Sequence, residues 1–275
     1  MSAVQEERAG TSTALLVDER EDRVVARIDG PATRNAIDAA LVEQLHELCA
    51  RLEEEPRVLV LAGGDGVFAS GADIRQLRER RREDALRGIN SGVFDRIARL
   101  PLPSIAAVDG HALGGGAELA YACDFRIATP RTRFGNPEAG LGIMAAAGAT
   151  WRLRDLVGEP LAKEVLLAGR VLDAGECLAA HLVTEVVEVD DLLPAAHRLA
   201  DRVLRNGELA LRLTKLALRV PAGAHPAFDD VAQAVLFETE EKERRMTAFL
   251  ERKRAPRTAG TSGAPATGTD EGGRR

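Results

Sequence analysis

Short apolar runs alternate with longer amphipathic stretches along the first two thirds of this 275-residue chain. Two such runs, 14–17 and 24–28, flank a charged segment, which is a pattern typical of a β-hairpin. Apolar residues then recur at helical spacing from Ile37 to Leu48, which predicts an amphipathic helix over 37–53. The chain therefore opens in the rhythm of a layered α/β protein.

The rest of the chain continues this alternation and then becomes mainly helical. Further strands are predicted over 58–61, 104–108, 125–128 and 182–187. Further helices are predicted over 85–99, 117–122, 151–157, 160–168, 173–180, 191–205, 208–219 and 227–252. Residues 134–138 are expected to be extended, and the small apolar residues 139–149 are expected to be flexible. This order predicts an α/β fold whose final third is helical.

The composition argues against nucleic acid, a metal ion and a membrane as partners of this chain. A net charge of −6 and an aromatic content of 3% argue against nucleic acid, which favours a basic face and stacking side chains. Cys49, Cys123 and Cys177 lie far apart and lack metal-ligand spacing, so we expect reduced thiols in a cytoplasmic protein and no metal site. No apolar run has the length that spans a bilayer, so no membrane partner is expected.

Two glycine-containing turns each follow an apolar strand and open a helix. The first is Ser70–Gly71–Ala72–Asp73, and the second contains Gly114, Gly115 and Gly116 in a row. If the two strands are parallel neighbours, one backbone N–H group from each turn converges on a single point, as in an oxyanion hole. The alternative is two unrelated turns that only let strand and helix pack closely.

Glu118 and Glu138 are the carboxylates nearest these turns, and both have apolar neighbours. Two half-buried carboxylates beside an oxyanion hole can hold a water molecule and transfer its proton. The alternative is a helix N-terminal charge for Glu118 and a solvated loop acid for Glu138. The spacing of the two residues by itself favours this second interpretation.

Three segments are specific in combination: GVFASGADI at 66–74, SIAAVDGHALGGGAELAYACDFRIAT at 104–129, and RFGNPEAGLGI at 133–143. In this order and spacing, the chain resembles the enoyl-CoA hydratase/isomerase (crotonase) family over residues 14–256. The resemblance implies an α/β fold with a crotonase-like ββα spiral core and a helical C-terminal region. We expect a flexible N-terminus over 1–10, the spiral core over 11–190, a helical trimerisation region over 191–254 and a disordered tail over 255–275.

The resemblance also implies roles for individual residues. The backbone N–H groups of Ala72 and Gly115 would form the oxyanion hole for a thioester carbonyl. Glu138 would deliver or remove the substrate proton, and Glu118 would help to position the attacking water. Contacts to the coenzyme A (CoA) part of the substrate are expected from Ala32, Thr33, Arg34, Ser70, Ala72, Asp73, Ile74, Gly115 and Arg252. No cofactor is expected, because CoA is part of the substrate.

The resemblance predicts an enoyl-CoA hydratase that adds water in a syn sense across the 2,3-double bond, acting as a homotrimer or a dimer of trimers. The presence of both glutamates favours hydration over another reaction of the family, such as that of a double-bond isomerase, a lyase or a thioester hydrolase. A non-catalytic acyl-CoA-binding subunit is a further alternative. One departure concerns Ala145 and Ala146, which stand where hydratases often have Pro-Gly near the water.

Overall fold

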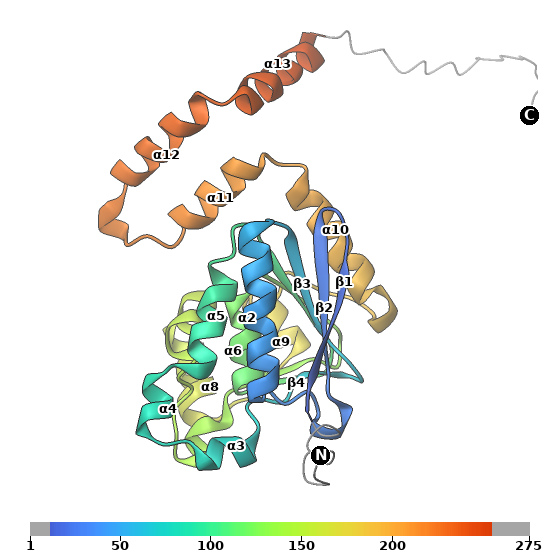
Figure 1. The fold of residues 1–275 in the computed structure, drawn as a ribbon, viewed down its shortest axis with the longest axis vertical. Helices are drawn as coiled ribbons and strands as arrows, with labels where there is room; N and C mark the ends of the chain where they lie inside the picture. The colour runs from blue at the N-terminus through green and yellow to red at the C-terminus, as the bar shows by residue number, and fades with distance from the viewer. Residues whose placement is uncertain (1–11, 255–275) are drawn as a thin grey trace, which may run out of the picture. The chain divides into compact units, whose positions relative to one another are not determined.

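The structure, a computed structural model, describes residues 12–254 and has the predicted α/β composition (Figure 1). The expectations of a flexible N-terminus over 1–10 and a disordered tail over 255–275 lie outside the described residues. The chain divides into two compact units, Met1–Phe228 and Asp229–Arg275. No helix within residues 12–254 is long and apolar enough to cross a membrane.

A six-stranded sheet forms the centre of the first unit, with strand order β1-β2-β3-β5-β7-β10. Its strands are β1 (Ala14–Glu19), β2 (Arg23–Asp29), β3 (Val58–Gly63), β5 (Ser104–Val108), β7 (Phe125–Ala128) and β10 (Glu185–Val186). The first pair is the antiparallel hairpin expected from the sequence, and every other pair is parallel. Parallel strands need crossover segments that cover the faces of the sheet, which explains the nearly unbroken apolar character of β3 and β5.

Alternate residues of β3 belong to two different cores, because successive side chains of a strand point to opposite faces. Leu59 and Leu61 pack with α2 (Ala39–Glu54), α5 (Ile89–Ala98) and α6 (Gly115–Ala122). Val58, Val60 and Ala62 lie in the second core, to which α10 (Leu192–Leu204) contributes its apolar face. Figure 1 shows α2, α5 and α6 grouped together, away from α10.

A second, four-stranded sheet has the order β4-β6-β8-β9. Its strands are β4 (Val67–Ala69), β6 (His111–Leu113), β8 (Arg133–Gly135) and β9 (Leu172–Asp173). The first three are parallel, and each follows directly on a strand of the large sheet: β3 leads to β4, β5 to β6 and β7 to β8. The chain therefore repeats a strand–strand–helix turn, which is the expected ββα spiral. Gly110 permits one sharp corner, because a Cβ there would lie 1.7 Å from the carbonyl oxygen of Gly66.

The other helical elements belong to the first unit, except α13 and all but the start of α12, which belong to the second unit. They are η1 (Pro31–Thr33), α3 (Ile74–Glu79), α4 (Arg82–Leu86), η2 (Pro137–Leu141), η3 (Ala149–Leu153), α7 (Arg154–Val157), α8 (Glu159–Ala168), α9 (Ala174–Ala179), η4 (Val189–Asp191), α11 (Glu208–Ala217), η5 (Ala222–Ala224), α12 (Ala227–Phe237) and α13 (Glu240–Arg254).

Four of the expected elements have different boundaries in the structure. The extended segment over 134–138 ends at Gly135, because Pro137 begins a 3-10 turn. The strand expected over 182–187 is limited to β10. The helix expected over 85–99 begins only after Gly88, which adopts a left-handed conformation (φ 63°). The helix expected over 227–252 is two helices, α12 and α13, because the Thr239 hydroxyl accepts a hydrogen bond from the backbone N–H of Lys242.

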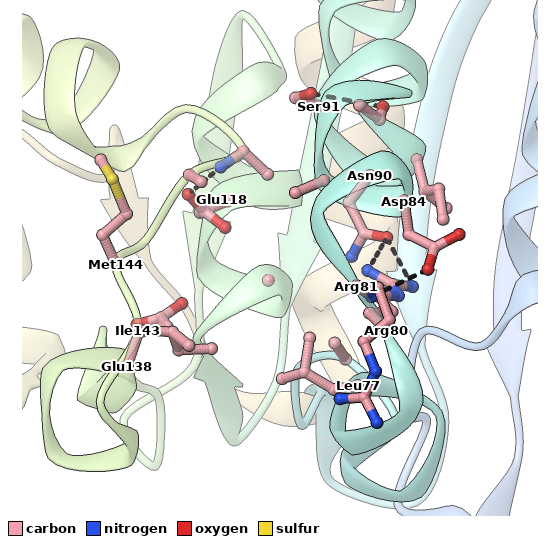
Figure 2. Close-up of a pocket in the computed structure, with 17 residues that line it drawn as sticks. Leu77, Arg80, Arg81, Asp84, Asn90, Ser91, Glu118, Glu138, Ile143 and Met144 are labelled. Carbon is pink, nitrogen blue, oxygen red and sulfur yellow. Dashed lines mark hydrogen bonds between the residues drawn. The ribbon is translucent and has the colours of Figure 1, made fainter.

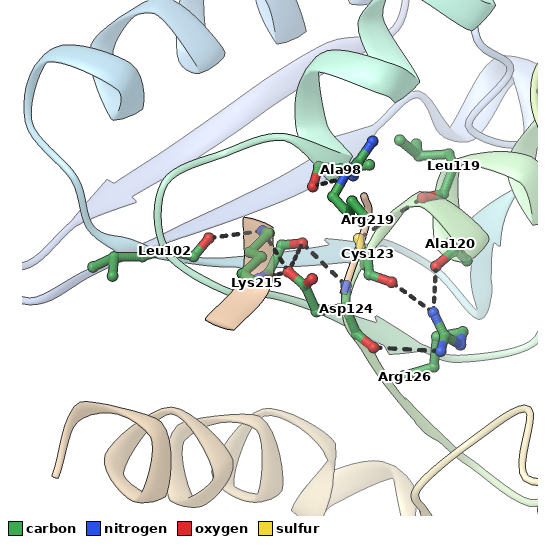
Figure 3. A network of polar contacts seen from close by, with 10 residues as sticks. Ala98, Leu102, Leu119, Ala120, Cys123, Asp124, Arg126, Lys215 and Arg219 are labelled. Carbon is green, nitrogen blue, oxygen red and sulfur yellow. Dashed lines mark hydrogen bonds and ion pairs between the residues drawn. The ribbon is translucent and has the colours of Figure 1, made fainter. Parts of the chain in front are cut away.

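A buried lysine anchors α11 to the large sheet (Figure 3). Nζ of Lys215 donates to the carbonyl oxygen of Leu102 at 3.1 Å and to Oδ2 of Asp124 at 2.7 Å. The same Asp124 oxygen accepts from the backbone N–H of Ser104 at the start of β5. Because a buried ammonium group needs such partners, this cluster holds the start of β5, the end of α6 and α11 together.

Candidate active site

The two glycine-containing turns lie side by side, as the parallel-strand interpretation predicted. They follow β4 and β6, which are parallel neighbours. A Cβ atom on Gly71 would lie 3.7 Å from the backbone nitrogen of Gly115, and one on Gly115 would lie 3.5 Å from the backbone nitrogen of Ala72. The amides of Ala72 and Gly115 are therefore close neighbours.

Both of these amides are unengaged within residues 12–254. The bridge between Ile37 and Ala72 uses the carbonyl of Gly71 and the N–H of Asp73, which leaves the N–H of Ala72 directed away from Ile37. Gly115 is the first residue of α6, and the first N–H groups of a helix have no partner inside it. Two free donors at one point are the arrangement that binds a developing negative charge on an oxygen.

The three successive glycines have different structural roles. Gly114 adopts φ 53°, and a Cβ atom there would lie 3.1 Å from Oε1 of Glu138. Gly116 packs so closely that a Cβ atom would lie 2.1 Å from the carbonyl oxygen of Ala69. The close-packing interpretation therefore holds for Gly116, whereas Gly115 contributes the free amide.

A cavity of about 440 Å³ contains both amides and both glutamates (Figure 2). Figure 2 shows Glu118, Glu138 and Met144 on one wall and Asn90 with the α3–α5 segment on the other. Within residues 12–254, no group of three or more His, Cys, Asp and Glu side chains is arranged to hold a metal ion.

Glu118 lies in the first turn of α6 but is only 3% exposed. Its Oε1 accepts hydrogen bonds from the backbone N–H groups of Ala147 (2.7 Å) and Ala149 (3.1 Å). Burial raises the pKa of Glu118 to about 7, with a further increase from the charge of Glu138, while the two amides act in the opposite direction. A carboxyl group with a pKa near neutrality can exchange a proton at physiological pH.

Glu138 is buried, with 9% exposure, and is not the solvated loop acid of the alternative interpretation. Its Oε1 accepts a long hydrogen bond of 3.4 Å from Asn136, and its Oε2 is buried without a hydrogen-bond partner among residues 12–254. Burial raises the pKa of this carboxyl group, and the Asn136 amide partly offsets that effect. Tyr121 in turn donates to Asn136 at 3.2 Å. Glu138 also lines the cavity, so a carboxyl group with unused hydrogen-bonding capacity lies at its wall.

The loop from Met144 to Ala149 holds Glu118 in place. Ala146 is exposed and lines the cavity, whereas Ala145 is buried. The backbone N–H groups of this loop still reach Glu118 despite the alanines in place of Pro-Gly. Ala145, Ala147 and Ala149 are buried, whereas residues 139–144 are exposed, and the flexibility expected for 139–149 stays a prediction.

The residues expected to contact CoA come from two adjacent segments. Ala32 and Thr33 lie in η1, and Arg34 follows in a left-handed conformation. The Ser70 hydroxyl donates to the carbonyl oxygen of Thr33 at 3.3 Å, which joins this segment to the first turn. Beside Ser70, Asp73 caps α3 and Ile74 is 59% exposed. Arg252 belongs to α13 in the second unit, so its approach to this region stays a prediction.

Sequence reasoning did not identify Asn136, Tyr121 or the Ala147 and Ala149 amides as parts of the site. Asn136 lies two residues before Glu138, and that proximity was the available signal. The backbone N–H groups of Ala147 and Ala149 could not be identified from the sequence, because every residue except proline has a backbone N–H group.

Comparison with known proteins agrees with this geometry. Residues 20–258 match the family model described as enoyl-CoA hydratase/isomerase. The chain belongs to the enoyl-CoA hydratase/isomerase family. It is 36% identical over 250 residues to a crotonyl-CoA hydratase of Syntrophomonas wolfei, covering 88% of this chain and 96% of that protein. It is 37% identical to a 2,3-dehydroadipyl-CoA hydratase of Escherichia coli, covering 88% of this chain and 97% of the relative.

The fold is also that of this enoyl-CoA hydratase/isomerase family. The crystal structure of an enoyl-CoA hydratase from Bacillus anthracis superposes with a TM-score of 0.81 at 32% identity, covering 86% of this chain and 96% of that one. The crotonase-like fold and the family predicted from the sequence are confirmed.

Proposed function

We propose that this protein is an enoyl-CoA hydratase that adds water across the 2,3-double bond of a 2-enoyl-CoA thioester. The observation that carries the proposal is the presence of two buried glutamates and two free backbone amides in one cavity. The names of the relatives, a crotonyl-CoA hydratase and a 2,3-dehydroadipyl-CoA hydratase, support the same reaction.

In the proposed reaction, the thioester carbonyl oxygen accepts hydrogen bonds from the N–H groups of Ala72 and Gly115. These donors stabilise the enolate that forms when water attacks C3, because they are already oriented toward the oxygen on which the negative charge develops. The negative charge thereby develops on the thioester oxygen, next to the N–H groups of Ala72 and Gly115, which have no other partner within residues 12–254.

The two glutamates divide the proton transfers. Glu118, held by two loop amides, positions the attacking water and accepts the proton that the water loses as its oxygen bonds to C3, while Glu138 delivers its own proton to C2. The raised pKa of Glu138 favours the protonated form that this step needs. Figure 2 shows both carboxyl groups on one wall of the cavity, so hydroxyl and proton reach the same face of the double bond, which is syn addition.

Substrate binding and assembly follow from family membership. The CoA part would lie along Ala32, Thr33 and Arg34 and the 70–74 turn, with Arg252 at its phosphates, and no cofactor would be required. The protein would be a cytoplasmic homotrimer or dimer of trimers. Light scattering after size-exclusion chromatography tests this assembly.

Ultraviolet absorbance of the conjugated thioester tests the reaction, because hydration of crotonyl-CoA abolishes the enoyl band. We expect Glu118→Gln and Glu138→Gln each to lower kcat by about 100-fold or more. Glu43→Gln, on the exposed face of α2, is the matched control. An unchanged rate in either active-site variant contradicts the two-carboxylate mechanism.

The same assay separates the alternative functions. Appearance of the enoyl band from a 3-enoyl-CoA, without hydration of crotonyl-CoA, identifies an isomerase. Tight acyl-CoA binding without turnover of any thioester identifies a binding subunit.

A further inference from the structure

The cavity wall opposite the two glutamates is rich in polar side chains. From α3 to α5 it includes Arg80, Arg81, Asp84, Asn90 and Ser91. Figure 2 shows these side chains across the cavity from Glu118, Glu138 and Met144. A pocket for a plain hydrocarbon chain has little use for guanidinium and amide groups, because they lose hydration when the chain binds.

Arg80 is a partly buried cation that forms no ion pair within residues 12–254. Among the described residues its guanidinium donates only to Oδ1 of Asn90, with Nη1 and Nη2 at 3.4 and 3.3 Å. Burial lowers the pKa of Arg80, and Asp84 opposes this effect from beyond ion-pair distance. An arginine stays charged, so a partly buried guanidinium with one long amide contact has unused capacity for an anion.

The other charges of this wall are engaged or exposed. Asp84 accepts from the backbone N–H of Arg81 at 2.9 Å and pairs with Arg87 at 3.7 Å. The Arg81 side chain is exposed to solvent. Arg80 is therefore the partly buried cation on this wall that lacks a carboxylate partner among residues 12–254.

This polar wall extends to the oxyanion-hole amides. Asn90 is buried, and its Nδ2 lies 3.6 Å from the position that a Cβ atom would take on Gly115. A ligand whose thioester oxygen lies at the Gly115 amide is therefore close to Asn90, and Asn90 in turn contacts Arg80. The segments expected to bind CoA, 32–34 and 70–74, do not include this wall.

We propose that the acyl group of the substrate carries a second carboxylate, which Arg80 binds with the support of Asn90. The substrate class is then a 2-enoyl-CoA whose acyl chain ends in a carboxylate. Arginine suits this role because its planar fork matches the two oxygens of a carboxylate. The proposal rests on the hydratase function and specifies its substrate.

The test compares kcat/KM for crotonyl-CoA with kcat/KM for a six-carbon 2-enoyl-CoA that ends in a carboxylate. We expect the wild-type protein to favour the carboxylated substrate by about tenfold or more, and Arg80→Gln to lower that ratio by about 10- to 100-fold. Arg80→Lys, which keeps the charge, should recover part of the ratio. Arg78→Gln, two residues earlier in α3 and with a side chain that is 83% exposed, should leave the ratio unchanged. A wild-type ratio at or below one, or a ratio that Arg80→Gln leaves intact, overturns the proposal.

A second arm distinguishes a substrate carboxylate from the phosphates of CoA. If Arg80 instead binds a CoA phosphate, Arg80→Gln weakens both CoA substrates equally and has no effect on pantetheine thioesters, which lack those phosphates. That result also overturns the proposal. With a carboxylate as ligand, the loss of selectivity persists in the carboxylated pantetheine thioester.

Isothermal titration calorimetry measures ligand affinity directly and therefore tests the carboxylate site without turnover. A saturated acyl-CoA with a terminal carboxylate is compared with its uncharged analogue of equal length, on the wild-type protein and on Arg80→Gln. Failure of the proposed hydratase function appears as absent turnover of both enoyl substrates. Failure of the carboxylate proposal appears as equal affinity for the two saturated ligands.

Discussion

The backbone N–H of Ala147 lies 2.7 Å from Oε1 of Glu118, although 29 residues separate the two in the chain. The carbonyl oxygen of Ala147 accepts from Nη1 of Arg152 at 3.3 Å, and Nη2 of Arg152 contacts Asp95 at 3.2 Å. Asp95 also accepts from Arg219, which follows α11. A chain of polar contacts therefore connects α5 and the end of α11 to the loop that orients Glu118.

Arg152 should act as a positioning residue for Glu118. We expect Arg152→Met to lower kcat for crotonyl-CoA hydration by roughly ten- to a hundredfold, because the loop loses a buried charge-assisted contact. Arg152 also lowers the pKa of Glu118, so its removal raises that pKa and moves the acidic limb of the kcat/KM profile to higher pH. The measurement is kcat/KM between about pH 5 and 9.

Arg154→Met provides a matched control for this variant. Arg154 is 58% exposed and contacts Asp155 at the surface, so its removal should change neither kcat nor the profile. An Arg152→Met protein with reduced kcat and an unshifted pH profile would point to general loosening of the fold rather than to Glu118.

Glu118 should make the protein less stable as the pH rises. Its pKa in the folded protein is about 7, against an ordinary value of 4.5, so the native state binds more protons than the unfolded state between these values. The free energy of unfolding therefore falls as the pH rises through this window, and the contribution of Glu118 above it is destabilising by about 3 kcal/mol.

Glu118→Gln tests that linkage, because an amide keeps an oxygen acceptor for the two loop N–H groups but carries no charge. We expect the variant to exceed the wild type in free energy of unfolding by about 1–3 kcal/mol at pH 8, with most of that difference lost by pH 5. Urea unfolding at both pH values measures it. A Gln variant that is less stable than wild type at pH 8 would contradict the raised pKa.

Gly116 should be intolerant of any side chain. Gly116→Ala places a Cβ atom 2.1 Å from the carbonyl oxygen of Ala69, so α6 or β4 must move, and we expect a loss of about 3 kcal/mol or more in the free energy of unfolding. Gly92→Ala is the matched control inside α5, because nothing lies within 4 Å of its Cβ position. That control should stabilise the protein by about 0.5–1 kcal/mol. Similar effects of the two substitutions would refute the close packing.

The three cysteines should be inert in the native protein. Burial raises the pKa of Cys49, Cys123 and Cys177 to about 12, and the thiolate is the reactive form. Ellman's reagent at about pH 8 should therefore titrate no thiol in the folded protein and all three in urea. Glu47→Cys, at an exposed position on α2, supplies a positive control. Rapid native labelling of the wild type would show an open core.

Much of the framework was predictable from local pattern. The apolar runs of β3 and β5 identify buried parallel strands, because both faces of such strands need apolar side chains. Boundaries were less predictable where one side chain decides them, as with the Thr239 cap that divides α12 from α13. The small residues of 139–149 likewise gave no sign that the backbone N–H groups of Ala147 and Ala149 bind Glu118.

The sequence by itself determined the fold class, the two turns, the pair of glutamates and the family, because each depends on residue type at short spacing. Only the tertiary structure decided that Glu118 is held by the Ala147 and Ala149 amides and that Oε2 of Glu138 has no partner in the part of the chain that the structure describes. It alone placed Arg80 in the same cavity. The physical reason is that backbone amides are identical along the chain, and a pKa or a free hydrogen-bonding group depends on burial by distant segments.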